Sequence, residues 1–161
     1  MREKPVWLPA MVQTNGEWQH VLRRLYQIFE NDFKNNRCLF RGSEIWWDKR
    51  ILEGDDFEEG FWHLITKGGE QRLFDPRRAE RLPWCSAIIN NANDGSVKVW
   101  DYKEKRGAIR TYLWLEDWDY AIILEKKQVG QRIVFFVITA FHVDGESRRR
   151  SLRVKYSKRI S

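Results

Sequence analysis

The chain is poor in the features that mark secreted, zinc-binding and membrane-spanning proteins. Its two cysteines, Cys38 and Cys85, do not have the ligand spacing of a structural zinc site. A disulfide is not needed where a full core can form, so we expect both thiols to be reduced. The longest apolar run, residues 133–141, is far shorter than the roughly 20 residues that cross a bilayer. No apolar segment follows the basic start. We therefore expect a cytoplasmic protein with no membrane partner.

Familiar catalytic signatures are also missing. The sequence has no Walker loop, no GxGxxG, no HExxH, no CxxC pair and no GxSxG. The carboxylates do not recur with histidine at ligand spacing, so we expect no metal and no other cofactor. Three histidines remain: His20 at a helix start, and His63 and His142 as candidate acid–base groups.

What the chain does have is enough apolar sequence for one domain. It is 161 residues long, and hydrophobic residues make up 42% and aromatic residues 14%. This length and composition predict a single folded domain with a real core over residues 1–161, and they exclude a disordered chain.

The first half is predicted to be mainly helical. Apolar residues recur at helical spacing over residues 17–34, and a short strand is expected near 44–47. Residues 60–67 alternate as in a strand, which would place His63 and Lys67 on one face.

A second helical region is predicted to follow that strand. The pair Asp75-Pro76 is typical of a helix start, with a cap followed by proline at the first helical position. Because Pro83 interrupts a regular helix, we expect a short turn at 76–82 and a second helical piece at 83–91.

From residue 97 to residue 142 the apolar pattern has a period of two. We expect four strands joined by short turns at residues 97–102, 108–115, 120–126 and 132–142. The predicted fold is therefore α+β, with N-terminal helices packed on a four-stranded, or with one more strand five-stranded, antiparallel meander.

The excess positive charge is concentrated at one end of the sequence. The chain has 29 Lys and Arg against 23 Asp and Glu, a net charge of +6. Residues 145–161 hold seven of the basic residues and one acid, which is also +6, so 22 of each sign remain in residues 1–144. Such a basic tail attracts polyanions, although a solvated helix or strand, partly neutralised by the acidic residues 53–59, fits as well.

The outer face of the predicted sheet carries alternating basic and aromatic residues: Lys98, Trp100, Arg110, Tyr112 and Trp114. If open, this face suits phosphates and unstacked bases, whereas packing alone also explains strand aromatics.

Histidine, arginine and lysine without a metal site suit the cleavage of RNA, because RNA carries its own nucleophile in the 2′-hydroxyl. The protein then supplies a base, an acid and fixed cations around the phosphate. Arg77 and Arg81 lie four residues apart on one helical face, at a helix start that favours an anion.

Several segments together resemble a phage-associated branch of the nuclease superfamily that groups barnase, EndoU, colicin and RelE-like ribonucleases. The resemblance runs from about residue 18 to the end of the chain, and it rests on Phe61-Trp62-His63-Leu64, Arg77-Arg78-Ala79-Glu80-Arg81-Leu82-Pro83-Trp84, Val99-Trp100, Asp119-Tyr120, and Ile138-Thr139-Ala140-Phe141 followed by an arginine-rich end. It implies helices packed on a four-stranded antiparallel sheet, and metal-independent RNA cleavage, often in toxins of prophages or mobile elements.

Carried over to this sequence, the resemblance implies that His63 is an acid or base, that Arg81 holds the phosphate with Arg78 as a second choice, and that Thr139 holds the phosphate or orients the substrate. His142 is predicted to point to the face opposite Thr139. The second proton group would otherwise be Tyr112 or Lys67.

Further substrate-binding candidates come from the residue patterns: Lys67, Arg77, Arg110 and Tyr112, with Arg149 and Arg150 in the basic tail. Two alternatives to a ribonuclease remain open. One is a non-catalytic nucleic-acid-binding module, and the other is an interaction domain whose tail docks an acidic partner such as an antitoxin-like inhibitor protein.

Overall fold

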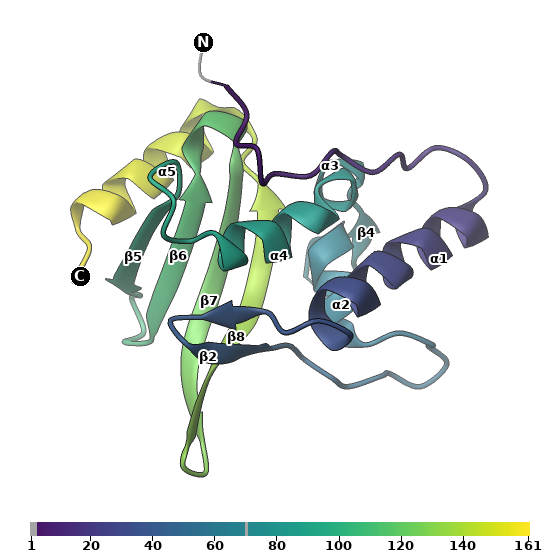
Figure 1. Cartoon of the computed structure of the whole chain (residues 1–161), viewed down its shortest axis with the longest axis horizontal. Helices are drawn as coiled ribbons and strands as arrows, with labels where there is room; N and C mark the ends of the chain where they lie inside the picture. The colour runs from purple at the N-terminus through teal and green to yellow at the C-terminus, as the bar shows by residue number, and fades with distance from the viewer. Residues whose placement is uncertain (1–2, 70) are drawn as a thin grey trace.

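The computed structural model describes residues 3–69 and 71–161, which form an α+β fold (Figure 1). The helices are α1 (Trp18–Phe29), its continuation as the π-helix η1 (Glu30–Lys34), α2 (Glu59–Ile65), α3 (Pro76–Glu80), α4 (Leu82–Asn90), the 3-10 turn η2 (Glu116–Trp118) and α5 (Gly145–Ser157). The strands are β1 (Leu39–Phe40), β2 (Ser43–Trp46), β3 (Thr66–Lys67), β4 (Leu73–Phe74), β5 (Lys98–Lys103), β6 (Ile109–Leu115), β7 (Tyr120–Val129) and β8 (Arg132–His142). None of the described helices combines the length and apolar character that crossing a membrane requires.

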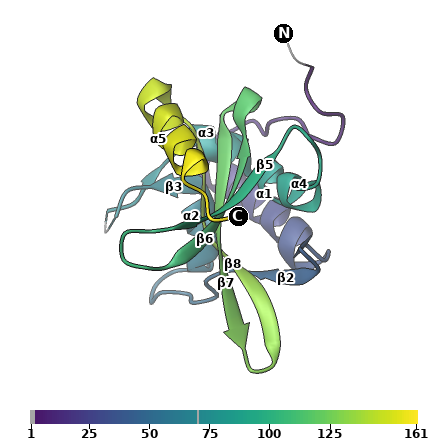
Figure 2. The same cartoon turned by 90° about the vertical axis from the view of Figure 1, so that its left-hand side faces the viewer.

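The main sheet has six strands in the order β1-β2-β8-β7-β6-β5. The predicted meander is present as β5 to β8, with antiparallel pairing throughout. The prediction of a four- or five-stranded, wholly antiparallel sheet nevertheless differs from the structure in the number of strands and in the direction of one of them. The hairpin β1–β2 adds to the free edge of β8, and β2 runs parallel to β8, with Glu44 opposite Val134. The far end of the β7–β8 hairpin extends beyond the rest of the sheet (Figure 2).

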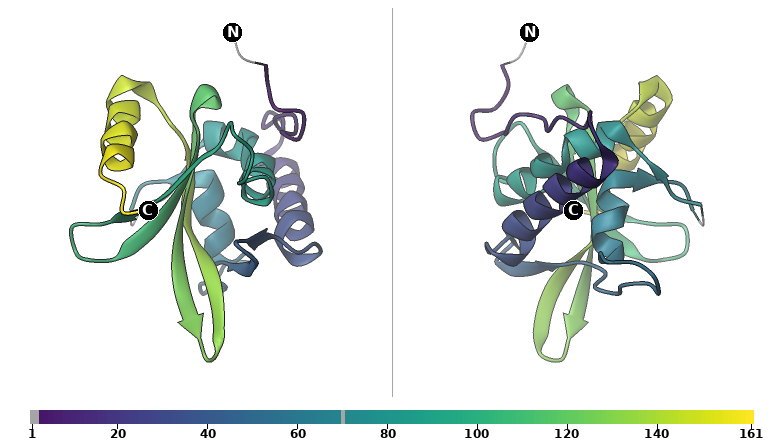
Figure 3. Two further views of the ribbon diagram at one scale, coloured as in Figure 1. Left: turned by 60° about the vertical axis from the view of Figure 1, so that its left-hand side comes forward. Right: turned by 90° about the vertical axis from the view of Figure 1, so that its right-hand side faces the viewer.

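Helices cover both faces of the sheet (Figure 3). Helices α1 to α4 lie on one face, and α5 lies on the other. The buried side of α1 consists of Val21, Leu22, Leu25 and Phe29, which continues the helical spacing that predicted the helix. These residues belong to one large apolar cluster with the inner residues of α2, α4 and the sheet.

The predicted strand at 60–67 is wrong, because these residues form α2 and then the two-residue strand β3. Phe61, Leu64 and Ile65 are almost fully buried, and their spacing of three and four residues is that of a helix face. Gly60 allows the helix to pack closely, since an added Cβ would lie 2.7 Å from the Cβ of Trp47. His63 and Lys67 therefore do not share a strand face.

The sheet face predicted to be open to bases is covered by α5. Trp100, Tyr112 and Trp114 are 0%, 1% and 0% exposed, and Leu152 of α5 belongs to the same apolar cluster. The rings of Trp100 and Tyr112 stack with their centroids 5.1 Å apart. These aromatics pack against the tail, which forms a helix, and cannot stack on a nucleobase in this fold.

The cations of α5 are partly neutralised by carboxylates in the connections between strands of the sheet, and not by residues 53–59. Arg149 lies 2.7 Å from Asp119, and Arg153 lies 3.3 Å from Glu116. A third pair joins Lys155 to Glu104 at 3.7 Å. The basic tail is thus a packed helix that three ion pairs join to the connections β5–β6 and β6–β7.

Candidate anion-binding site

A hollow of about 430 Å³ lies where the end of β8 meets β3, α3 and the first turn of α5. We call it the basic pocket. Its lining residues are Lys67, Asp75, Pro76, Arg77, Arg78, Glu80, His142, Asp144 and Arg148. They come from segments that are far apart in the sequence.

The start of α3 is fixed by Asp75. Its carboxylate accepts hydrogen bonds from the backbone N–H groups of Arg77, at 3.0 Å, and Arg78, at 3.3 Å, as the Asp75-Pro76 pair predicted. The expectation that this helix start holds an anion is wrong, because α3 has only five residues and Asp75 already occupies its free N–H groups.

Arg78 ties α3 to the end of α2. Its Nη1 donates to the carbonyl oxygen of Thr66 at 2.7 Å and to that of His63 at 3.4 Å, and its Nε lies 3.5 Å from a carboxylate oxygen of Asp75. Burial lowers the pKa of the guanidinium. Arg78 therefore satisfies carbonyl groups at a helix end while it forms one wall of the pocket.

Three other cations of the pocket remain available. Lys67, Arg77 and Arg148 are exposed, and none of them forms an ion pair with a carboxylate in the part of the chain that the structure describes. The guanidinium of Arg148 lies over the ring of Phe141, 5.8 Å from the centroid. Exposed guanidinium and ammonium groups without an ion-pair partner are well suited to hold a phosphate.

His142 is the titratable group among these cations. Its Nδ1 is buried and has no hydrogen-bond partner among the described residues. Burial lowers the pKa of the imidazole, the charges of Arg81 and Arg77 lower it further, and Asp119 and Asp144 act in the opposite direction. The uncharged ring is therefore favoured, and an anion bound nearby would favour the protonated ring.

The strand register separates His142 from Thr139, as the sequence predicted. His142 lies opposite Tyr120, which belongs to the core under α1 to α4. Thr139 lies opposite Ile123, which packs in the cluster under α5. Because directly paired residues share a sheet face, the two side chains lie on opposite faces.

None of the three residues that the resemblance made catalytic, His63, Arg81 and Thr139, lines the basic pocket. His63 is half-buried in α2, and burial and Arg72 lower its pKa, while Glu59 and Asp48 oppose them. It does not line the basic pocket. Arg81 donates from Nη1 to the carbonyl oxygen of Arg77 at 3.0 Å, and its guanidinium lies over the ring of Trp84, 5.3 Å from the centroid.

The other predicted substrate residues divide into two groups. Lys67, Arg77 and Arg78 lie together in the basic pocket. The remaining ones lie elsewhere: Arg110 near Glu125, Tyr112 under α5, Arg149 at Asp119, and Arg150 exposed on α5.

Tyr112 is unsuited to proton transfer with a substrate. Its hydroxyl donates to Glu104 and accepts from Nζ of Lys155 at 2.9 Å. Burial and Glu104 raise its pKa far above that of an ordinary tyrosine. The hydroxyl is therefore fully engaged within the protein.

The sequence did not predict that Arg148 belongs to the site, or that His142 lies beside the predicted cations. The sequence feature that could have indicated this is the pair Asp144-Gly145, which lies between the two residues and is typical of a turn into a helix. Asp144 is the N-cap residue of α5, and Gly145 has a φ of 86°, which glycine adopts without strain. This turn folds α5 back on the sheet and brings Arg148 beside the end of β8.

Comparisons with known proteins add no further constraint on the site. No family model matches the chain, and neither the curated proteins nor the solved structures contain a match. Among the described residues, no three His, Cys, Asp or Glu side chains converge as ligands of a metal ion would.

Proposed function

We propose that the basic pocket binds a phosphate of RNA and that the protein is a metal-independent endoribonuclease. One observation carries the choice of site. An imidazole without a hydrogen-bond partner at Nδ1 lies beside three exposed cations that form no ion pair with a described carboxylate. The reaction class comes from the sequence resemblance and from the chemistry that these side chains support.

In the proposed reaction, neutral His142 accepts the proton of the 2′-hydroxyl as its oxygen attacks the adjacent phosphorus. The bond from the 2′-oxygen to phosphorus forms, and the bond to the 5′-oxygen breaks. Arg77 and Arg148 stabilise the negative charge on the phosphoryl oxygens. The ammonium group of Lys67 gives a proton to the leaving 5′-oxygen, so the products are a 2′,3′-cyclic phosphate and a 5′-hydroxyl.

A lowered pKa of His142 supports its role as the base. The uncharged ring can accept a proton at neutral pH, and the surrounding cations are those that a phosphodiester would neutralise. Arg81 acts on this ring through its charge. The role that the resemblance gives to His63 remains a separate prediction, and so do the toxin role and the cytoplasmic location.

The test is cleavage of a mixed-sequence RNA oligonucleotide in the presence of EDTA, with the termini identified by mass spectrometry. We expect 2′,3′-cyclic phosphate ends. Replacing a general base costs about 10²–10⁴-fold in rate, so His142→Ala should lose cleavage to that extent. His20→Ala, an exposed position on α1, is the matched control and should retain the full rate.

His63→Ala in the same assay separates the two site assignments. Loss of cleavage in His63→Ala together with full activity in His142→Ala would contradict the proposed site and restore the assignment made by resemblance. Cleavage that requires a divalent ion would contradict the proposed mechanism.

The pocket also favours a second function, a non-catalytic RNA-binding module. The observation behind it is that the pocket contains one imidazole and no second histidine among its lining residues. Wild-type protein that binds RNA with steep salt dependence but leaves it intact would establish this alternative.

A further inference from the structure

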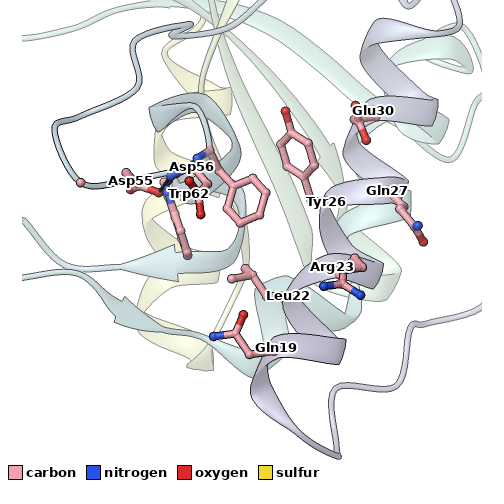
Figure 4. A pocket seen from close by; sticks show the side chains of 11 residues that line it. Gln19, Leu22, Arg23, Tyr26, Gln27, Glu30, Asp55, Asp56 and Trp62 are labelled. Atoms are coloured by element: carbon pink, nitrogen blue, oxygen red, sulfur yellow. Dashed lines mark hydrogen bonds between the residues drawn. The ribbon is translucent and has the colours of Figure 1, made fainter.

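Two further hollows lie between α1, the loop at residues 54–57 and α2. The first has a volume of about 410 Å³ and is drawn in Figure 4. The second, of about 350 Å³, is lined also by Trp18, Leu52 and Phe74. Asp55 and Trp62 line both hollows, which therefore adjoin. We call this pair the aromatic groove, and none of its lining residues lines the basic pocket.

The aromatic groove exposes large apolar side chains. Trp18 is 41% exposed and Leu52 is 51% exposed. Trp18 packs edge to face against Phe74, with the ring centroids 4.8 Å apart. Exposed tryptophan beside aliphatic side chains is a typical anchor region of protein interfaces.

The groove is held open by contacts within the protein. Glu58, which is 5% exposed, accepts a hydrogen bond from the hydroxyl of Tyr26 at 2.5 Å and pairs with Nζ of Lys34 at 2.9 Å. The turn from α1 into the π-helix η1 carries Lys34 to this position. Because these contacts fasten the loop to α1, the groove needs no ligand to form.

The loop itself is also fixed. A carboxylate oxygen of Asp55 accepts hydrogen bonds from the backbone N–H groups of Asp56 and Phe57. The ring of Phe57 packs on that of Tyr26, with the centroids 4.3 Å apart. Figure 4 shows α1 with Leu22 and Tyr26 on one side and the loop with Asp55 and Asp56 on the other.

The edges of the groove are acidic. Glu30, Asp56 and Glu59 line it and form no ion pair with any residue that the structure describes. The basic lining residues are Arg23 and Arg72. Aromatic rings beside unpaired carboxylates favour a guanidinium or ammonium group and disfavour RNA.

We propose that the aromatic groove docks a segment of a partner protein in which a basic side chain lies next to a large apolar one. The basic side chain enters the first hollow, beside Tyr26, Trp62 and Asp56. The apolar side chain packs in the second hollow, against Trp18 and Leu52. Charge complementarity selects this occupant over an acidic or a nucleic-acid partner.

A second copy of this chain is a poorer occupant. Its most basic segment is α5, and three cations of that helix, Arg149, Arg153 and Lys155, are already paired with carboxylates of their own chain. Docking α5 into the groove would exchange existing ion pairs for new ones, with little net gain.

The test uses an array of synthetic dodecapeptides in four sets: basic with apolar, basic with serine, acidic with apolar, and serine with apolar. We expect the full-length protein to bind the basic–apolar set about tenfold more tightly than each other set. Asp56→Lys combined with Glu30→Lys should remove this preference. Glu3→Lys, an exposed charge reversal in the N-terminal segment, should retain it.

Leu52→Ser provides a second variant on an exposed loop, where loss of the side chain leaves the core intact. It should weaken basic–apolar peptides and leave basic–serine peptides unchanged. RNA cleavage should persist in all these variants, and Leu52→Ser, which changes no charge, should also keep its RNA affinity. Failure here is therefore distinguishable from failure of the ribonuclease proposal.

Three outcomes would overturn the inference. One is equal binding of the acidic and basic sets, and another is an unchanged preference in the Asp56→Lys, Glu30→Lys protein. The third is a dimer of the wild-type chain in sedimentation that the same charge reversals dissociate, which would identify a second copy as the occupant.

Discussion

The basic pocket and the aromatic groove both contain charged side chains without ion-pair partners among the described residues, but the balance of charge differs. Cations outnumber carboxylates in the pocket, and carboxylates outnumber cations in the groove. In the pocket, cations lie beside one imidazole, and the lining residues include no Phe, Tyr or Trp. In the groove, carboxylates stand at the edge of exposed rings. A compact anion needs many donors and little apolar surface, whereas an extended protein segment gains affinity mainly from apolar anchors. The two regions therefore suit ligands of different kinds.

The contrast also shows that the net charge of a segment of sequence does not predict where charges of one sign gather on the folded protein. Residues 1–144 are neutral in sum, with 22 charges of each sign, yet Lys67 and Arg77 lie in one region and Asp56 and Glu59 in another. The net positive tail, by contrast, uses several of its cations within the fold.

The largest expected effect follows from reversing the charge of the basic pocket with Arg77→Glu and Arg148→Glu. Like charges facing a phosphate cost several kcal/mol, so RNA affinity should fall about 100-fold or more. The slope of log affinity against log salt should fall by about one to two, because two phosphate contacts are lost. Fluorescence anisotropy at several salt concentrations measures both.

The matched control for this reversal is Arg37→Glu with Arg106→Glu. Both residues are exposed and lie outside the pocket. An equal loss of affinity in this pair would mean that overall charge, and not the pocket, attracts the RNA.

A smaller effect is expected when the support of the aromatic groove is removed. Glu58→Gln removes the carboxylate charge that faces Tyr26 and Lys34, and hydrogen bonds to a charged group contribute about 1.5–3 kcal/mol. The free energy of unfolding in urea should fall by about 2 kcal/mol. Glu53→Gln, on the exposed part of the same loop, should change it by less than about 0.5 kcal/mol.

The cost of Glu58→Gln should depend on pH. Burial tends to raise the pKa of Glu58, but the hydrogen bonds from Tyr26 and Lys34 outweigh it, and the net pKa lies below the ordinary 4.5. A lowered pKa stabilises the fold above the unfolded value and loses this contribution as the pH falls through the folded value. The difference between the two proteins should therefore shrink below pH 4.5. A constant difference would argue against an ionised Glu58.

The smallest expected change is a shift in the pKa of His142. Inorganic phosphate in the pocket should raise this pKa, because an anion favours the protonated ring. Arg77→Gln should raise it in the free protein, since the charge of Arg77 lowers it. A proton NMR titration measures both shifts, with His20 as the internal reference. An unmoved His142 resonance would place the anion elsewhere.

Much of the fold was predictable because periodicity reports which side of an element is buried. The alternation from residue 97 onward predicted β5 to β8, and helical spacing predicted α1 with η1. The error at α2 has a physical origin. Phe61 and Ile65 lie four residues apart, which places them on one side of either a helix or a strand.

The parallel pairing of β2 and the helical form of the tail were not predictable from local patterns. Strand β2 is short, and its partner lies about 90 positions later in the chain. In α5 only Leu152 is buried, so the apolar residues of this segment do not distinguish the helical period of 3.6 from the strand period of two.

The candidate site was predictable in part. Lys67, Arg77 and Arg78 were predicted to bind substrate, and they line one pocket. Arg78 was predicted by the resemblance, Arg77 by its helical spacing from Arg81, and Lys67 by a strand at 60–67 that the structure does not contain. Which histidine accompanies them depends on tertiary structure. The register of β8 and the turn at Asp144-Gly145 place His142 there, and no pattern within a short window contains that information.

The pairing of β2 with β8 constrains the order in which the protein can mature during translation. Residue 44 leaves the ribosome long before its partner at residue 134, so β2 and the early helices wait for a docking surface that has not yet been synthesised. Non-local pairing of this kind slows folding and leaves apolar surface exposed. The basic pocket needs residues 67 and 148 together, so this pocket cannot form on a nascent chain until residue 148 has emerged.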